Sequence, residues 1–356
     1  MQPALLPKER LLPFLRDLAT GRRLIVPVRD ERGTRFGDLP DEAGAALVLD
    51  VVNTDESPKE AVFPQWEPLF DLRDLGVAPE VEPVAPEVQP WLLFGVRPCD
   101  CRALVLLAQL FEADTPDPYH SIRRRAGIIV ALTCVQSGPT CFCTWMGVPL
   151  DRPEGADILL TPLDDAYLVE ALTEQGQKQL AAAAGHLQEA DDKHLQAKQA
   201  ALEALRAAQP APPFDASDEA SLRSLAEVVM PEEQEPFWQA IARACIGCGV
   251  CTLGCPTCTC FDVNDDGIGE HAERYRCWDS CQFKFYALEA SGHDPRPEQW
   301  ERQRNRIGHK LSFSVDRFGQ LTCVGCGRCV RQCPVNIDIR EAIRHLATAA
   351  SRAKTP

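Results

Sequence analysis

Two cysteine-rich runs near the C-terminal end constrain the fold of this chain more than any other feature of its sequence. The first run, CIGCGVCTLGCP, begins at Cys245, and the second, CVGCGRCVRQCP, begins at Cys323. Both have the spacing C-x2-C-x2-C-x3-C-P, with glycines between the closely spaced cysteines. Because glycine allows the backbone to turn tightly, the thiols of each run can face a common centre. This part of the chain therefore has to fold around a group that thiols bind.

The spacing of each run is the one with which bacterial ferredoxins bind [4Fe–4S] clusters, and in them the cysteine before proline ligates the other cluster. By that rule the first cluster has the ligands Cys245, Cys248, Cys251 and Cys333, and the second has Cys323, Cys326, Cys329 and Cys255. Zinc is the alternative, but zinc ribbons use well-separated C-x2-C pairs. The sequence thus predicts two [4Fe–4S] clusters, close enough to exchange one electron.

The composition excludes several classes of protein. A chain of 356 residues with 45% hydrophobic residues is long enough for two or three domains. Its net charge of −15 argues against nucleic-acid binding, which needs clustered Lys and Arg. No segment has the roughly twenty apolar residues that span a bilayer, and the first residues do not resemble a secretory signal. Because most of the 17 cysteines are expected to bind metal, we expect a cytoplasmic protein without membrane contact.

Alternating strand and helix patterns predict an α/β domain over residues 1–212. A helical pattern broken by prolines covers residues 1–20, and an Ala-rich helix weakened by Gly176 and Gly185 is expected within 173–208. Between them, short apolar runs predict strands, and one longer run predicts a helix. The strands are expected at 24–28, 46–52, 91–96 and 127–133, and the helix at 101–111.

The PAPP segment at 210–213 is the predicted boundary between two domains. We expect residues 213–356 to form a mainly α-helical, dicluster ferredoxin-like domain. The stretch between the two cysteine runs is too long for a simple ferredoxin hairpin, so residues 261–320 are expected to be an insertion with structure of its own. Helices are predicted at 216–228, 234–244 and 335–346.

Five more cysteines lie near the ends of two predicted strands in the first half of the chain. Loops at the carboxyl edge of a parallel sheet are where α/β proteins bind ligands. We therefore predict a third cluster, with the ligands Cys99, Cys134, Cys141 and Cys143. Cys101 begins a helix and is expected in the core, and Asp100 is considered as an oxygen ligand in its place. In the alternative interpretation, all five cysteines pack as small apolar side chains.

Several segments beyond the cysteine runs resemble the dicluster iron–sulfur subunit of two related complexes. One is the beta subunit of soluble multi-subunit NiFe hydrogenases, or sulfhydrogenases, and the other is the A subunit of anaerobic sulfite reductase. In the second half the segments are CGVCTLGCPTCTCFDV (248–263), RYRCWDSCQF (274–283), SGHDPRP (291–297), RIGHKLSF (306–313) and CVGCGRCVRQCPVNIDI (323–339). In the first half they are SPKEAVFPQWEPLF (57–70), FGVRPCDCRAL (94–104), CVQSGPTCFCTWMG (134–147) and DILLTPL (157–163).

This resemblance implies an electron-transfer subunit that joins a flavin-bearing NAD(P)H subunit to a catalytic partner, with FAD and NAD(P) bound by the partner. A NiFe hydrogenase is the favoured catalytic partner. The equivalent subunit of anaerobic sulfite reductase, or of another soluble oxidoreductase, is the alternative. A third hypothesis is a flavin-binding reductase whose N-terminal sheet holds the flavin. The chain has no G-x-G-x-x-G or G-x4-G-K-[ST] motif, so we expect no nucleotide site in it. A hydrogenase large subunit has C-x2-C pairs near both ends and this sequence begins with none, so we expect no terminal catalytic centre either.

The insertion contains further residues whose types are common in functional sites. Its extra cysteines are Cys258, Cys260, Cys277 and Cys281. We expect them to be packing residues, since unligated cysteines are usually buried; a separate metal site and a tuning role for Cys260 are the alternatives. No zinc-type spacing involves His271, His293 or His309, which are expected to be structural. A solvated or ion-paired face is expected for Arg274, Arg276, Arg302, Arg304 and Arg306.

Overall fold

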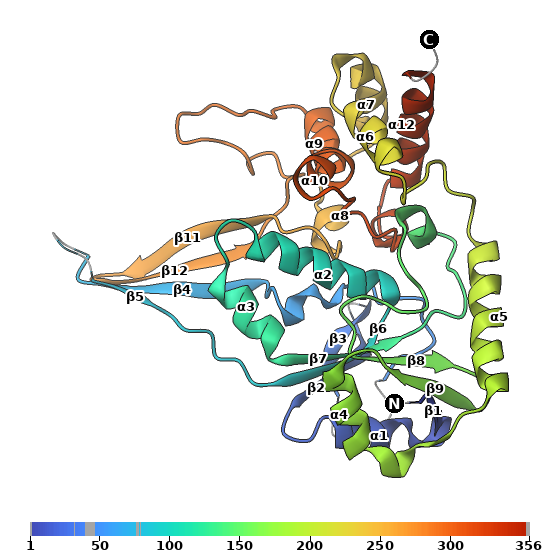
Figure 1. Ribbon diagram of the computed structural model, residues 1–356. Helices are drawn as coiled ribbons and strands as arrows, with labels where there is room; N and C mark the ends of the chain where they lie inside the picture. The colour runs from blue at the N-terminus through green and yellow to red at the C-terminus, as the bar shows by residue number, and fades with distance from the viewer. Residues whose placement is uncertain (1, 32, 40–46, 76–77, 79, 354–356) are drawn as a thin grey trace.

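The computed structural model describes residues 2–31, 33–39, 47–75, 78 and 80–353. An eight-stranded mixed sheet lies in the first half of the chain, and a four-stranded antiparallel sheet extends from the body of the molecule (Figure 1). Most helices of the second half lie together on the side opposite the large sheet (Figure 1). The two cysteine runs lie between these helices and the α/β part.

Parallel strands form the centre of the large sheet, whose order is β10-β1-β9-β8-β7-β6-β2-β3. β2, β6, β7 and β8 are parallel neighbours, and every residue of β6 and β7 is buried. Continuous apolar strands of this kind are typical of a sheet covered on both faces. The strands are β1 (Ala4–Pro7), β2 (Arg23–Asp30), β3 (Gly33–Asp38), β6 (Trp91–Val96), β7 (Gly127–Leu132), β8 (Ile158–Pro162), β9 (Ala166–Ala171) and β10 (Gln188–Glu189).

Helices cover both faces of this sheet, because alternate residues of a strand point to opposite faces. α1 and α4 pack on the face that includes Leu92 and Ile128, and α2 packs on the face that includes Leu93 and Ile129. The helices of this half are α1 (Leu11–Leu18), α2 (Pro98–Glu112), α3 (Pro118–Arg125), α4 (Glu174–Ala182) and α5 (Asp192–Ala208). Short 3-10 turns occur at η1 (Lys8–Arg10), η2 (Pro58–Ala61), η3 (Cys143–Met146) and η4 (Ala184–His186).

The small sheet combines strands from both halves of the chain, in the order β11-β12-β4-β5. Its strands are β4 (Trp66–Arg73), β5 (Glu80–Pro83), β11 (Phe261–Ile268) and β12 (His271–Trp278). β12 pairs antiparallel with β4. A buried ion-pair group strengthens this junction, since Arg276 of β12 pairs with Glu67 of β4 and with Asp117, and Arg123 also pairs with Glu67.

The helices of the second half share one hydrophobic core with part of the first half. Trp238, Leu311 and Ile343 belong to this core together with Leu106 of α2 and Phe142. The helices are α6 (Glu219–Glu227), α7 (Glu235–Ala242), α8 (Val250–Leu253), α9 (Gln299–Leu311), α10 (Phe313–Phe318), α11 (Arg328–Arg331) and α12 (Ile339–Ala353), with a 3-10 turn at η5 (Glu232–Gln234). Within the described part of the chain, no helix is long and apolar enough to cross a membrane.

Most of the predicted elements are present, and the differences have local causes. The strands predicted at 24–28, 91–96 and 127–133 are β2, β6 and β7, and the helix at 101–111 is α2. The helical prediction for residues 1–20 is wrong at its start, because Ala4–Pro7 pairs with β9 as strand β1.

Three further predictions need correction or completion. The strand predicted at 46–52 begins outside the described residues, and its described part forms a single bridge, Leu47 to Val28. The helix predicted within 173–208 is split into α4 and α5 by the segment around Gly185. The insertion, 261–320, contains a β-hairpin as well as α9 and α10, so the second half is not purely helical.

Candidate iron–sulfur centres

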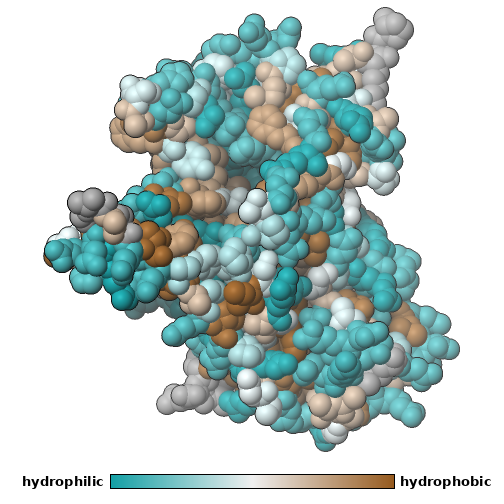
Figure 2. Space-filling model, turned by 60° about the vertical axis from the view of Figure 1, so that its left-hand side comes forward, coloured by the Kyte–Doolittle hydropathy of each residue, from teal (hydrophilic) through white to brown (hydrophobic). Residues whose placement is uncertain are grey.

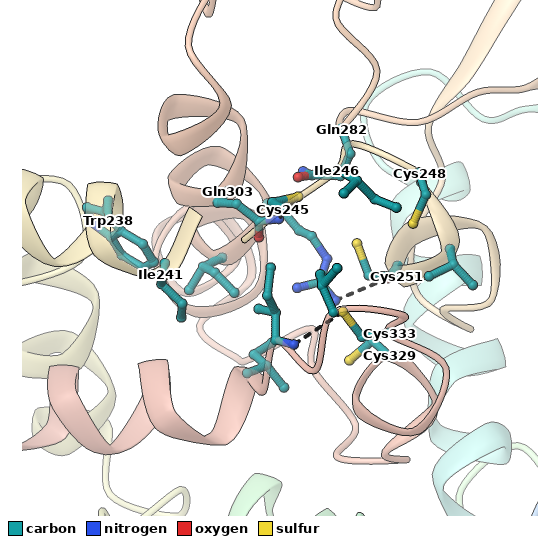
Figure 3. A pocket seen from close by; sticks show the side chains of 17 residues that line it. Trp238, Ile241, Cys245, Ile246, Cys248, Cys251, Gln282, Gln303, Cys329 and Cys333 are labelled. Atoms are coloured by element: carbon teal, nitrogen blue, oxygen red, sulfur yellow. Dashed lines mark hydrogen bonds between the residues drawn. The ribbon is translucent and has the colours of Figure 1, made fainter. Parts of the chain in front are cut away.

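The thiols assigned to the first cluster line one small pocket of about 30 Å³ between α7, α8 and α9. These are Cys245, Cys248, Cys251 and Cys333, and Cys329 of the second run lines the same pocket. In Figure 3 the sulfur atoms of Cys248, Cys251, Cys329 and Cys333 point into the same space. The cysteine before proline in the second run therefore lies with the first three cysteines of the first run, as crossed ligation requires.

Hydrogen-bond donors around this pocket favour thiolates. Gln303 donates its side-chain N–H to Cys245 Sγ at 3.1 Å, and the backbone N–H of Ile337 donates to Cys333 Sγ at 3.2 Å (Figure 3). Donors of this kind stabilise the anionic form of the acceptor. Burial acts in the opposite direction and raises the pKa of Cys251 to about 11. The protein alone therefore keeps this thiol protonated, and binding of a metal would supply the charge that ionises it.

The thiols assigned to the second cluster also lie together. Burial raises the pKa of Cys326 to about 12, and the charges of Cys255 and Cys329 raise it further. Burial likewise raises the pKa of Cys323 to about 11, against the lowering effect of Lys310, and Cys329 and Cys255 again add to it. Cys255 and Cys329 therefore lie close enough to Cys323 and Cys326 to affect their pKa values. Cys255 of the first run thus lies with the thiols of the second run.

Two buried cations face these thiols. Lys310 and Arg306, both on α9, are 3% and 4% exposed. The Lys310 Nζ lies 3.3 Å from Cys255 Sγ. Burial lowers the pKa of Lys310, but the charges of neighbouring thiolates, Cys255 first, outweigh that effect and raise it. A buried cation needs a compensating anion, so these residues fit a thiolate-bound group of negative charge.

The loop of the second run packs directly on the first half of the chain. Gly325 and Gly327 adopt left-handed conformations, with φ of 61° and 76°. A Cβ atom on Gly325 would lie 2.4 Å from the carbonyl oxygen of Phe142, and one on Gly327 would lie 2.4 Å from that of Thr140. Only glycine allows this approach, which brings the loop containing Cys141 onto the second run.

The four cysteines of the predicted third cluster form a further group at the carboxyl edge of β6 and β7. Burial raises the pKa of Cys134 to about 12; Arg97 opposes this, and the charges of Cys143 and Cys141 add to it. Burial also raises the pKa of Cys99, followed by contributions from Asp100, Cys326 and Cys143. The influence of Cys326 shows that this group adjoins the second run.

The residues next to Cys99 have other roles. Cys101 lies in the core between α2 and the sheet, which agrees with the expectation for it. Asp100 cannot serve as the oxygen ligand that we considered, because both of its carboxylate oxygens accept hydrogen bonds from Arg328, at 2.6 and 2.8 Å. Both side chains are fully buried. Asp100 therefore binds the second cysteine run to α2.

Sequence reasoning missed several residues that surround the thiols. They are Gln209, which donates to Cys143 Sγ at 3.3 Å, and Gln303, Lys310 and Arg328. Arg328 lies between two cysteines of the second run, which is the one local signal for it. The ion-paired form of the expectation holds for Arg274, which pairs with Asp265, and for the buried Arg276, which pairs with Glu67 and Asp117. Arg302 and Arg306 are buried and not solvated. Within the described residues, no three His, Cys, Asp or Glu side chains could hold a single metal ion.

Comparisons with known proteins relate this chain to iron–sulfur proteins. Residues 244–337 match the model of a 4Fe-4S dicluster domain. Over 328 residues the chain is 30% identical to sulfhydrogenase 2 subunit beta of Pyrococcus furiosus, and the match covers 91% of this chain and 92% of that protein. The chain belongs to the sulfhydrogenase beta-subunit family. As a sulfhydrogenase beta-type chain, it is an iron–sulfur, electron-transfer subunit.

Proposed function

We propose that this chain conducts electrons between a flavin subunit and a NiFe hydrogenase subunit through [4Fe–4S] clusters bound to its own cysteines. The observation on which this depends most is the contiguity of the three thiol groups. Cys329 of the second group lines the pocket of the first. Cys326 of the second group lies in the same hydrophobic core as Cys99 and Cys143 of the third. Clusters bound at these positions would be neighbours, which one-electron transfer needs.

The proposed ligands are those predicted from the sequence. The first cluster is bound by Cys245, Cys248, Cys251 and Cys333, the second by Cys323, Cys326, Cys329 and Cys255, and the third by Cys99, Cys134, Cys141 and Cys143. When bound, such clusters supply reversible one-electron chemistry. The chain supplies the thiolates, the charges of Lys310 and Arg306, and an apolar shell that keeps water from the sulfur atoms.

One side of the first group is open to a partner. Cys248 is exposed, and the neighbouring Ile246 is 65% exposed. We propose that a partner covers this exposed thiol and the apolar side chain beside it. The first group is therefore the proposed point at which a partner's redox centre approaches.

The small sheet offers a second surface for partner contact. Figure 2 shows apolar residues gathered on the part of the molecule that protrudes. The exposed apolar side chains of this sheet are Trp66, Val81, Phe261, Val263 and Ile268. We propose that a subunit of the complex packs against this sheet and covers these side chains.

Other parts of the proposal follow from the resemblance to sulfhydrogenases. FAD and NAD(P) are bound by a partner and terminal catalysis belongs to another subunit, in a cytoplasmic complex. The division into residues 1–212 and 213–356 stays a prediction, although the small sheet joins strands from both sides of that boundary.

Purification of the complex with a tag on this chain tests the proposal. We expect a flavin subunit and a NiFe subunit to co-purify, and the complex to couple NAD(P)H to hydrogen evolution. In a Cys245→Ser, Cys251→Ser variant, the NAD(P)H-linked activity should be lost, while hydrogen evolution from a dye that reduces the catalytic subunit directly should remain. Cys277→Ser is the control and should keep both activities. Co-purification of a sirohaem subunit in place of the NiFe subunit would contradict the hydrogenase assignment.

A further inference from the structure

We propose that Cys258, Cys260 and Cys281 bind an additional iron–sulfur cluster. The three cysteines line a pocket of about 290 Å³ next to the second cysteine run. α2 borders it on one side, and α9 and α10 border it on the other. This volume is several times the roughly 30 Å³ that one water molecule occupies. The pocket therefore has room for a group larger than a single ion.

The β11–β12 hairpin brings two of these cysteines together. Cys260 directly precedes β11, and Cys281 follows the end of β12. The pair at the base of this hairpin is Phe261 with Trp278. The backbone N–H of Asp279 donates to the carbonyl oxygen of Cys260 at 3.0 Å, which closes the base of the hairpin. The thiols of Cys260 and Cys281 are consequently neighbours within interaction distance.

The fourth cysteine of the insertion does not belong to this group. Cys277 lies within β12, opposite Asp262. Its Sγ accepts a hydrogen bond from the side chain of Asn264 at 3.6 Å, and it does not line the pocket. Cys260 and Cys281 are thus neighbours in a pocket that Cys258 also lines, beside Cys255. Cys277 is close in sequence but outside the pocket, so it is a matched control.

Buried positive charge surrounds the pocket. Lys59 is 2% exposed, and its Nζ lies 3.1 Å from the carbonyl oxygen of Cys258 and 4.0 Å from the centre of the Trp278 ring. Arg306 and Lys310 line the pocket, and the buried Nε of Arg306 has no hydrogen-bond partner among the described residues.

Lys59, Arg306 and Lys310 face thiols, and none of them forms an ion pair with a carboxylate among the described residues. Burial lowers the pKa of Lys59, and the thiols of Cys258, Cys255 and Cys260 oppose this shift. Burying a cation without a partner is costly. An anionic cluster held by three thiolates satisfies this requirement, whereas neutral packed thiols do not. The expectation that these cysteines only fill space is therefore replaced by a binding role.

Three cysteines leave one position of a four-iron cube without a thiolate. The hydroxyl of Tyr286 interacts with the thiol of Cys260 and lines the pocket, so it or solvent can face that position. We infer a cluster whose fourth iron is exchangeable: loss of Fe²⁺ from [4Fe–4S]²⁺ leaves [3Fe–4S]⁰, and an added one-electron oxidant such as ferricyanide then gives the EPR-active [3Fe–4S]⁺. Because this site adjoins Cys255, the additional cluster would exchange electrons with the second cluster.

Iron and acid-labile sulfide analysis of the full-length, anaerobically reconstituted chain tests this proposal. We expect the Cys260→Ser, Cys281→Ser variant to bind about three to four fewer irons than the wild type and to lose the EPR signal of an oxidised three-iron cluster. The Cys277→Ser control should lose neither. Equal iron content and equal spectra in the double variant and the wild type would overturn the proposal, as would stoichiometric zinc in place of this iron.

A second measurement needs no substitution. Under native, anaerobic conditions, Cys260 should resist alkylation in the reconstituted protein and react after a chelator has removed iron. Equal alkylation of Cys260 in both states would overturn the proposal. This proposal can fail while the proposed function stands. In that case the EPR signals of the two cysteine runs would still be present.

Discussion

The two cysteine runs and the N-terminal cysteine group place thiols together in different ways. In each run, three thiols are neighbours because a few residues separate them and glycines allow a tight loop. In the N-terminal group, Cys99 and Cys134 reach the same edge of the sheet because they follow β6 and β7, which are parallel neighbours. A ligand set can thus be encoded locally, by spacing, or globally, by the topology of a sheet.

The two regions also depend on each other. The second run is anchored to the α/β part by the Arg328–Asp100 pair and by the side-chain N–H of Asn53, which donates to the Cys326 carbonyl at 2.8 Å. Local spacing therefore determines which thiols converge, while long-range contacts hold the resulting loop in position. Substitutions that separate these two contributions test the comparison.

The largest effect is expected from loss of a ligand in the locally encoded region. Cys333→Ser should remove or convert the cluster bound by the first three cysteines of the first run, with loss of up to about four irons per chain, because its thiol lies in that pocket. EPR of the full-length variant measures this. If the damaged signal is that of the Cys323 run, the crossed ligation is wrong.

Breaking the buried ion pair should be the largest effect on stability. Arg328→Met leaves the fully buried carboxylate of Asp100 without a partner, which typically costs about 3–5 kcal/mol. Arg317→Met, which breaks an exposed pair with Asp114, is the control and should change the free energy of unfolding by less than about 1 kcal/mol. Chemical denaturation measures both. Similar small changes in the two variants would show that the regions are not joined through Arg328.

A glycine pair separates backbone strain from close contact. Gly319 and Gly325 have similar φ angles, 66° and 61°, so alanine costs each roughly 1–2 kcal/mol of conformational strain. Only at Gly325 would the new Cβ meet backbone, since nothing lies within 4 Å of it at Gly319. Gly325→Ala should therefore destabilise the protein by about 1–3 kcal/mol more than Gly319→Ala. If the two variants have equal unfolding free energies, the loop of the second run can move away from the Phe142 backbone without cost.

The smallest expected effect is the pH dependence that His120 of α3 gives to the free energy of unfolding. This helix lies where the β11–β12 hairpin joins the first half of the chain through the Arg276–Asp117 pair. Burial lowers the pKa of His120 to about 4, with Asp117 opposing and Arg276 adding to the shift. The unfolded chain therefore binds this proton first as the pH falls below about 6.5, and stability decreases from there towards pH 4.

Replacing this histidine should remove its share of the pH dependence. His120 stacks on Phe111, with ring centres 4.7 Å apart, so phenylalanine can occupy its place. As the pH is lowered from 7.5 to 5.5, the unfolding free energy of His120→Phe should rise by about 1 kcal/mol relative to that of the wild type. If the difference in unfolding free energy between variant and wild type is the same at pH 7.5 and pH 5.5, His120 is not buried in its neutral form.

The sequence predicts the locally encoded features well and the long-range ones poorly, for physical reasons. Cysteine spacing predicts the runs, and the apolar runs of β6 and β7 predict that Cys99 and Cys134 reach one edge. The β11–β12 hairpin could not be predicted in this way, because β11 is exposed over most of its length and lacks a clear apolar alternation. Arg328 and Asp100 are 228 residues apart, so nothing local indicates that they pair.

The iron content of the full-length chain with and without the C-F-C thiols is the most direct test of the account. After saturating anaerobic reconstitution, the Cys141→Ser, Cys143→Ser variant should bind about four fewer irons than the wild type and keep the EPR signals of both cysteine runs. That result would show that the sheet edge holds a cluster and that the relay extends into the α/β region. Equal iron content in the two proteins would contradict it and confine the relay to the second half of the chain.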